Sequence, residues 1–333
     1  MKKYNVAILG ATGAVGQEMM KILAERDFPI NKLSLLASSR SVGRTYDFKG
    51  QTIAVTEACD SAFDGVDIVL GAAENDISRH FAPAIKASGA VYIDNSSAFR
   101  LDPDVPLVVP EINPGDAFRH SGIIANPNCS TIIALMALYP IAAISPIKTI
   151  VASTYQAVSG AGVGGMAELE AQLHAIATGG KIETKVFPYQ IAENLIPQIG
   201  GFNENGYTSE EMKMQNEGRK ILHAPDLRVS CTCVRVPVVR SHSISITVVT
   251  EKPVSPLEAA EAISGASGLR LCDDPASLVY PMPLDTSDQD LVYVGRIRRD
   301  LTNDNGLCLW CCGDQIRKGA AGNAVQIAEL LIK

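Results

Sequence analysis

A cysteine stands where the sequence predicts the first turn of a helix. Cys129 follows the β-prone run 122–125 and precedes residues 131–138, which are good helix formers with an apolar face. At a helix N-terminus the backbone dipole and the unpaired N–H groups lower a thiol pKa, and the same N–H groups can hold an oxyanion. The stretch 126–131 therefore offers a nucleophilic thiolate. Burial of the cysteine as a small hydrophobe is the alternative that this position alone leaves open.

A histidine and two arginines form a second group of residues that could take part in catalysis or binding. Arg235, Arg240 and His242 lie where two β-prone runs, 229–239 and 243–250, meet in a predicted hairpin. Histidine exchanges a proton near neutral pH, and the planar fork of arginine binds a carboxylate through two hydrogen bonds. These residues are candidates for acid/base chemistry and for anion binding, with a purely structural histidine as the alternative.

The first glycine-rich turn of the chain has the position of a nucleotide-binding turn. Residues 10–16 read G-x-x-G-x-x-G, directly after the predicted strand 4–9 and before the predicted helix 17–25. Glycines at such a turn let a pyrophosphate approach the helix N-terminus. We therefore predict dinucleotide binding here, against the alternative of an ordinary strand-to-helix turn.

The residues after the second predicted strand, 33–37, indicate which nucleotide is bound. They are Ser38, Ser39, Arg40 and Ser41. An NAD site usually offers an acidic residue to the ribose 2′-hydroxyl, whereas an arginine with hydroxyls suits a 2′-phosphate. The sequence therefore favours NADP.

These residues need a scaffold, and the first half of the chain predicts a parallel sheet. Further strands are expected at 66–71, 91–94 and 107–109, with a helix at 77–88, which is a βαβ alternation. Arg100 follows the strand 91–94, at the sheet edge where ligands of open α/β sheets bind, and is a candidate anion clamp.

The second half predicts a different domain. A strand at 147–156 leads into a glycine-rich loop and a helix at 166–177, and strands follow at 291–299 and 307–313. These long β runs suggest a mixed sheet whose outer face forms a dimer interface. The fold class is therefore α/β, with a Rossmann-type domain at 1–128, completed by a terminal helix at 315–333, and an α+β catalytic and dimerisation domain at 129–314.

Length and composition fit this division and exclude several functions. A chain of 333 residues suggests two domains, at about 150 residues for each. The net charge of −7 and the lack of like-charge runs argue against nucleic-acid binding. We expect no membrane span, no signal peptide and a cytoplasmic location, where the eight cysteines stay reduced. The C-x-x-C at 308–311 has no partner pair at zinc spacing, and we predict no metal site.

A nucleotide site combined with a reactive thiol indicates an aldehyde oxidised through a thioester, or the reverse reaction. Over essentially the whole chain the sequence resembles the aspartate-β-semialdehyde dehydrogenase family, and most closely its Gram-positive branch. The resemblance rests on residues 10–16 with 38–41, 126–131, Gln156 with 159–162, 210–213 and 235–242.

The resemblance implies a role for each matched position. Cys129 would be the nucleophile, Gln156 would orient the substrate, and His242 would be the acid/base. Arg235 would bind the substrate carboxylate and Glu210 its ammonium group. The remaining implied substrate residues are Arg100 and Lys213, which would bind phosphate, and Asn128. The implied NADP contacts are Gly10, Thr12, Gly13, Ala14, Val15, Arg40, Ser41, Ser159, Gly160 and Gln315.

The family converts aspartyl phosphate to the semialdehyde, for the synthesis of lysine through diaminopimelate and of threonine, methionine and isoleucine. The resemblance implies a homodimer for this chain, with a tetramer as the alternative. N-acetylglutamyl-phosphate reductase is the nearest alternative, but its motif usually reads Asn-Pro-Gly-Cys and its substrate has no free ammonium, so Asn128 and Glu210 favour the aspartyl substrate.

Three alternatives come from other classes of protein. A short-chain dehydrogenase needs Tyr-x-x-x-Lys, which the sequence lacks. A non-catalytic NADP sensor leaves Cys129 and His242 without a task. A cysteine hydrolase leaves the nucleotide turn without one.

Overall fold

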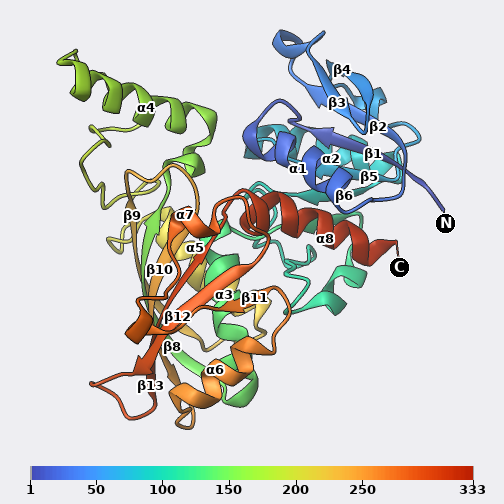
Figure 1. Cartoon of the computed structure of the whole chain (residues 1–333). Coiled ribbons are helices and arrows are strands. Elements are labelled where there is room, and N and C mark those ends of the chain that lie inside the picture. The colour runs from blue at the N-terminus through green and yellow to red at the C-terminus, as the bar shows by residue number, and fades with distance from the viewer. Residues whose placement is uncertain (1, 333) are drawn as a thin grey trace. The chain divides into compact units, whose positions relative to one another are not determined.

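The structure is a computed structural model that describes residues 2–332, and within it the chain divides into two units (Figure 1). The N-terminal unit contains the residues up to Asn128 and those from Ala320 onward, and the central unit is Cys129–Gly319. Gln315, expected in a terminal helix of the first domain, thus lies in the central unit.

The N-terminal unit contains a seven-stranded sheet in the order β3-β4-β2-β1-β5-β6-β7. All pairs are parallel except β3 with β4. The order of the six parallel strands is that of a doubly wound dinucleotide-binding sheet. The strands are β1 (Tyr4–Leu9), β2 (Ile30–Ala37), β3 (Thr45–Phe48), β4 (Gln51–Glu57), β5 (Ile68–Gly71), β6 (Val91–Asp94) and β7 (Ile123–Ala125).

Helices cover both faces of this sheet, which explains why its strands are continuous apolar runs. In β1, Val6 and Ile8 join the core beneath α1 and α8, while Ala7 and Leu9 join the core beneath α2. The helices are α1 (Ala14–Glu25), α2 (Asn75–Ala87) and α8 (Gly322–Leu331), with short helical turns η1 (Ser39–Ser41), η2 (Asp60–Phe63) and η3 (Pro114–Arg119).

The central unit contains a six-stranded mixed sheet in the order β11-β12-β13-β10-β8-β9. The pairs β8 with β9 and β11 with β12 are parallel, and the others are antiparallel. The strands are β8 (Ile147–Gln156), β9 (Arg228–Arg235), β10 (His242–Thr250), β11 (Leu269–Leu271), β12 (Val292–Arg299) and β13 (Gly306–Gly313). The predicted pairing of a Rossmann-type domain with a mixed-sheet domain is thereby confirmed.

Helices pack on one face of the central sheet. The helix α3 (Cys129–Ile144) is almost entirely apolar and packs against β8, β10, β12 and β13, which makes that face the inner one. The other helices are α4 (Gly162–Thr178), α5 (Ser209–Ile221), α6 (Pro256–Ser264) and α7 (Pro283–Thr286), with helical turns η4 (Val158–Ala161), η5 (Pro275–Ser277) and η6 (Arg317–Ala321).

Several expected elements differ from the observed ones. The run 107–109 forms only an isolated bridge, from Leu107 to Ala125, because the flanking Pro106 and Pro110 have no N–H to extend a ladder. The strands β3 and β4 were not predicted. The expected terminal helix 315–332 is interrupted by the π-helical turn η6, and α8 begins only at Gly322.

The expected hairpin at 229–250 is also wrong. The strand β9 ends at Arg235, before Pro237, and pairs in parallel with β8, whereas β10 lies between β8 and β13. Proline lacks the N–H that a continuing ladder would need. This rearrangement matters for function because it brings residues from distant parts of the chain to one edge of the sheet.

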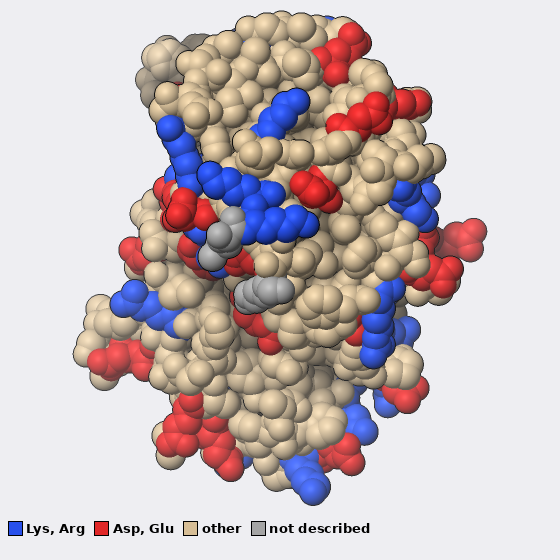
Figure 2. Space-filling model, turned by 90° about the vertical axis from the view of Figure 1, so that its right-hand side faces the viewer, with Lys and Arg blue, Asp and Glu red and all other residues tan. Residues whose placement is uncertain are grey.

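Three global features of residues 2–332 concern membrane spans, metal-binding clusters and cysteines. No helix there is long and apolar enough to span a membrane, and no group of three or more His, Cys, Asp or Glu could hold a metal ion. All eight cysteines are free thiols. Acidic and basic side chains are interspersed on the face drawn in Figure 2.

Candidate active site

The predicted active-site residues of the central unit converge because of strand register. Gln156 ends β8 and pairs with Arg235, which ends β9, while His242 begins β10 and pairs with Gly313 at the end of β13. Buried and exposed residues alternate along β8, and Gln156 falls on the buried side. The side chains of Gln156, Arg235 and His242 are all buried at this edge.

The amide of Gln156 is held by two hydrogen bonds and lies beside the histidine. Its Oε1 accepts from Thr154 Oγ1 at 3.0 Å, and its Nε2 donates to Glu210 Oε1 at 3.2 Å. The same Nε2 lies 3.4 Å from His242 Nε2. The amide is therefore fixed between the histidine and the carboxylate before any substrate binds.

His242 is fully buried, and a backbone group fixes its tautomer. The N–H of Ala157 donates to His242 Nδ1 at 3.0 Å, so a neutral imidazole carries its hydrogen on Nε2. Burial, helped by the positive charge of Arg235, lowers the pKa of His242 from 6.5 to about 3, against an opposing effect of Glu210. At neutral pH the ring is uncharged, and its Nε2 hydrogen and the amide of Gln156 are two donors close together.

A charged pair is placed beside this amide by α5. The helix begins with a capping box in which Thr208 Oγ1 accepts from Glu211 N and Glu211 Oε2 accepts from Thr208 N. Glu211 also accepts from Cys233 N at 2.9 Å, which ties the start of α5 to β9. One residue earlier, Glu210 is buried and accepts from Lys213 Nζ at 2.7 Å.

Arg235 is a buried cation with a fixed orientation. Its Nη1 donates to Ala157 O at 2.7 Å, and its guanidinium lies 6.0 Å from the ring centroid of Phe187. Burial lowers its pKa, while the negative charges of Glu210 and Cys129 oppose that shift. Arginine stays protonated at any accessible pH, so Arg235 is a permanent cation that can bind a carboxylate. Its charge interacts electrostatically with Glu210 and Cys129.

Cys129 is the first residue of α3, as its sequence context predicts, and it is partly exposed. The segment after β13 comes very close to it: a Cβ added to Gly319 would lie 2.9 Å from Cys129 Cβ. Only glycine fits there without displacing the cysteine.

The predicted cofactor residues of the central unit are also close to one another. Ser159 lies on η4, and its hydroxyl is hydrogen-bonded by Gln315 Nε2. A Cβ added to Gly160 would lie 2.7 Å from Arg235 Nη1 and 3.5 Å from His242 Nε2. The glycine-rich loop after β8 therefore touches the histidine and the arginine directly.

The N-terminal unit contains the other predicted cofactor residues. Gly10 has φ +87°, and a Cβ there would lie 2.5 Å from Ala72 O, so the turn requires glycine. The N-cap of α1, Gly13, makes no side-chain capping bond, which leaves the helix N-terminus open to an anion. Thr12 lies between these glycines, and Ala14 and Val15 begin α1.

A cavity at the edge of the N-terminal sheet fits a nucleotide. Its volume is about 490 Å³, which lies in the range typical of ligand sites. It combines the glycine turn with the ends of β2, β4 and β5. Its lining includes Gly10, Thr12, Gly13, Ser38, Ser39, Glu57 and His80. Arg40 and Ser41 follow on the turn η1 but do not line the cavity.

Two predicted substrate residues belong to the N-terminal unit. Arg100 follows β6 and is buried, with its Nη2 donating to Asn95 O at 2.9 Å. Asn128 is buried and is the last residue of this unit before Cys129.

Some residues of these sites were not predicted from the sequence. Glu57 and His80 were missed because β4 was not predicted and because His80 reads as an ordinary helical residue. The alternation at 52–55 was the signal for β4. Thr154 contacts Gln156 two residues along the same strand, and the spacing Thr208-x-x-Glu211 was a local signal for the capping box of α5. The bond from Cys233 N to Glu211 joins distant segments, and no local signal indicates it.

Known proteins match this chain in sequence and in fold. The family described as "Semialdehyde dehydrogenase, NAD binding domain" matches residues 5–120. The family described as "Semialdehyde dehydrogenase, dimerisation domain" matches residues 138–318. The chain is therefore a two-domain semialdehyde dehydrogenase, an oxidoreductase that binds a nicotinamide dinucleotide.

Curated relatives specify the family. Aspartate-semialdehyde dehydrogenase of Synechocystis is 51% identical over 98% of this chain and 97% of its own length, and that of Bacillus subtilis is 48% identical over 99% and 97%. The chain belongs to the aspartate-semialdehyde dehydrogenase family, and its activity is the one that defines the family, that of a phosphorylating aldehyde dehydrogenase. These identities do not single out the Gram-positive branch.

Solved structures agree. The aspartate semialdehyde dehydrogenase II of Vibrio cholerae, complexed with ASA, has a TM-score of 0.97 and 46% identity, covering 100% of this chain and 99% of that one. A probable aspartate-semialdehyde dehydrogenase of Pseudomonas aeruginosa has a TM-score of 0.93 and 30% identity, covering 100% and 99%.

Proposed function

We propose that Cys129 carries the acyl group in the reversible conversion of L-aspartate 4-semialdehyde, phosphate and NADP to L-aspartyl 4-phosphate. The observation that supports this most is the convergence of Gln156, Arg235 and His242 at one sheet edge, with Glu210 hydrogen-bonded to Gln156. An amino acid side chain that reacts at its far end needs a cation and an anion for its α-groups and donors for its reacting oxygen.

The charged groups match the two ends of that substrate. Arg235 binds the α-carboxylate through its guanidinium, whose orientation is already set by Ala157 O. Glu210 binds the α-ammonium group, and Lys213, now paired with Glu210, is released toward phosphate. Arg100 and Asn128 are proposed as the phosphate and substrate contacts of the N-terminal unit.

Cys129 performs the covalent chemistry. Its thiolate attacks the aldehyde carbon, and the carbonyl electron pair moves to the oxygen, giving a tetrahedral thiohemiacetal. A bound nicotinamide would supply the acceptor for the hydrogen and its electron pair. Departure of the hydrogen with its electron pair leaves a thioester on Cys129. A phosphate oxygen then attacks the acyl carbon, the C–S bond breaks, and the thiolate of Cys129 is regenerated.

His242 and Gln156 act on the substrate oxygen. In the tautomer that Ala157 imposes, His242 Nε2–H and the Gln156 amide can both donate to the oxygen of the tetrahedral intermediate. His242 can take the hydroxyl proton only when Nδ1 bears the ring hydrogen, which requires loss of the Ala157 hydrogen bond. The acid/base role therefore includes a change at Nδ1.

NADP is the proposed cofactor. The glycine turn, the open N-terminus of α1 and the cavity beside Ser38 and Ser39 accommodate the adenosine and pyrophosphate. Arg40 and Ser41 are proposed to bind the 2′-phosphate, and Ser159, Gly160 and Gln315 the nicotinamide end. The Candida albicans enzyme in its structure "with NADP" shares the fold, at 24% identity over 99% of each chain and a TM-score of 0.75.

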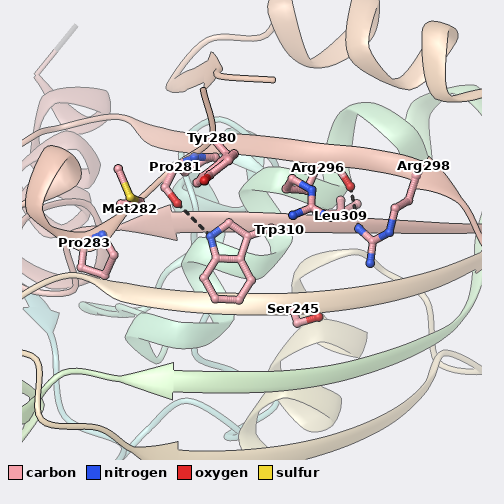
Figure 3. Close-up of a pocket in the computed structure, with 9 residues that line it drawn as sticks. All are labelled: Ser245, Tyr280, Pro281, Met282, Pro283, Arg296, Arg298, Leu309 and Trp310. Atoms are coloured by element: carbon pink, nitrogen blue, oxygen red, sulfur yellow. Dashed lines mark hydrogen bonds between the residues drawn. The ribbon is translucent and has the colours of Figure 1, made fainter. Parts of the chain in front are cut away.

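A homodimer is proposed to form through the outer face of the central sheet. Val151 is 50% exposed there, and Tyr155 packs against Trp310 with ring centroids 5.4 Å apart. Figure 3 shows the adjoining pocket of about 320 Å³, into which Trp310 projects while its Nε1 donates to Pro281 O at 2.9 Å. None of the predicted site residues lines this pocket, which supports its use for a partner. We also propose a cytoplasmic location, which is consistent with eight free thiols.

One assay tests the proposed reaction. NADP reduction should require both aspartate semialdehyde and phosphate, and it should be lost in Cys129→Ser. N-acetylglutamate semialdehyde, which lacks a free ammonium, serves as the control substrate and should react poorly. Turnover that survives Cys129→Ser, or that does not depend on phosphate, would contradict the mechanism.

A further inference from the structure

A buried carboxylate outside the predicted site is hydrogen-bonded to several chain segments that contain or adjoin site residues. Asp314 directly follows β13 and is 0% exposed. Its Oδ2 accepts from Arg240 Nε at 2.5 Å and from Asp288 N at 2.6 Å, and its Oδ1 accepts from Ile316 N at 2.9 Å and Arg317 N at 3.1 Å. Each oxygen thus accepts from two N–H donors, and the four donors come from three segments of the chain, at 240, 288 and 316–317.

One of these segments is the turn that presents the catalytic histidine. Arg240 precedes Ser241, whose φ of +75° is unfavourable for a residue with a side chain, and His242 follows. The turn keeps this conformation through Ser241 N, which donates to Gln315 Oε1 at 2.8 Å, and through Ser241 Oγ, which lies 2.5 Å from Thr286 Oγ1.

Another segment, residues 314–319, contains Gln315 at the proposed cofactor end and Gly319 beside Cys129. Gln315, next to Asp314, joins Ser241 to Ser159 through its side-chain amide: Oε1 accepts from Ser241 N, and Nε2 donates to Ser159 Oγ. The carbonyl of Asp314 accepts from Gly319 N at 3.0 Å, and Gly319 is the residue pressed against Cys129. Asp314 thereby closes the turn 314–319 at both its start and its end.

We propose that Asp314 is a positioning residue for the reaction, which sets His242, Gln315 and Gly319 relative to one another through its carboxylate. Asp314 is fully buried and makes its hydrogen bonds to the turns, so its effect on the reaction passes through the two turns that it holds. This inference rests on the proposed function for the identity of the reaction, but the hydrogen bonds that carry it are independent of the substrate.

The isosteric variant Asp314→Asn keeps the shape of the side chain but removes its charge and one of its two acceptor oxygens. An amide replaces one acceptor oxygen with an NH₂ group, which then faces two N–H donors, so one of the two turns loses its anchor. The matched control is Asp290→Asn. Asp290 belongs to the same charge network, accepting from Arg317 Nε at 2.7 Å, but its side chain is 51% exposed. It contacts the turn 314–319 through the Arg317 side chain rather than through the backbone.

The readouts are kcat, the KM for NADP and the pH profile, with Trp310 fluorescence as the check on folding. We expect Asp314→Asn to lower kcat at least about tenfold and to raise the KM for NADP. The pH profile should also gain an ionisation near the ordinary histidine range, since a loosened turn admits water to His242. Asp290→Asn should match the wild type in all three.

Two results would overturn the proposal. One is a folded Asp314→Asn protein with the kcat and pH profile of Asp290→Asn, and the other is a loss of thermal stability with kcat unchanged. If Asp314→Asn does not fold, Arg240→Gln removes the charged donor and leaves three backbone donors; wild-type kcat in that variant would equally overturn the proposal. Failure of the proposed function would appear separately, as wild-type protein that does not oxidise the semialdehyde while Asp314→Asn still changes the ¹⁵N signals of His242.

Discussion

The neutral state of His242 leads to a quantitative prediction about stability. The perturbation is His242→Gln, which removes the imidazole and keeps a polar side chain of similar length. Burial and Arg235 lower the pKa of the folded histidine from 6.5 to about 3, and Ala157 N–H occupies Nδ1, the atom that imidazolium would need to protonate. The folded protein therefore takes up no proton at this site while the unfolded chain does.

The sign and size follow from proton linkage. For a group whose pKa is depressed on folding, the stabilisation is fully present above the unfolded pKa of 6.5 and is lost as the pH falls toward the folded value. From about pH 7.5 to about pH 5.5 the unfolded histidine goes from about one-tenth to about nine-tenths protonated, which reduces the free energy of unfolding by about 1.4 kcal/mol. His242→Gln should lack this contribution.

The assay is urea denaturation of wild type and variant at both pH values. Trp310 is the single tryptophan of the chain and lies in the same unit as His242, so its fluorescence reports the unfolding of the right unit. Comparing the two proteins cancels the contributions of all other titrating groups. An equal pH dependence in both would refute the reasoning, as would a ¹⁵N resonance showing a proton on Nδ1 of folded His242 at neutral pH.

Three further predictions concern other parts of the sites. Arg40→Ala should raise the KM for NADP about tenfold or more, since a charge-assisted hydrogen bond contributes about 1.5 to 3 kcal/mol, while the KM for NAD changes little; equal effects in steady-state assays would show that Arg40 does not bind the 2′-phosphate. Gly160→Ala would place a Cβ 2.7 Å from Arg235 Nη1, so the KM for the semialdehyde should rise by about tenfold or more with the fold intact by circular dichroism; an unchanged KM would contradict the role of Arg235. Trp310→Glu should convert the proposed dimer to monomer in sedimentation velocity, and a persisting dimer would place the interface elsewhere.

The elements that the sequence predicted best are strands with both faces buried. The strands β1 and β6 were predicted at their observed bounds because both faces of a doubly wound sheet are buried, which produces a short uninterrupted apolar run. The strand β8 was also predicted at its bounds. The pattern failed at β3 and β4, whose many exposed residues resemble a polar loop.

Pairing between strands was beyond the reach of the sequence. Two β-prone runs joined by a short segment predict a hairpin, yet β9 and β10 lie on opposite sides of β8. Local propensity is the same for both arrangements, and the choice depends on the burial of β8 and on Pro237, which ends the first run.

The sequence by itself determined a thiol at a helix start, a glycine turn at a strand end, and an arginine and a histidine suited to anion binding and acid/base chemistry. These features can be read from the sequence because neighbouring residues are joined along the covalent chain. The substrate role of Glu210 was implied only by the resemblance to the family. The tertiary structure decided the state of each component. It buries His242 against Ala157 and Arg235 and so keeps the ring neutral, and it makes Asp314 the anchor of two turns, because burial and hydrogen bonding between distant segments arise only when the sheet has formed.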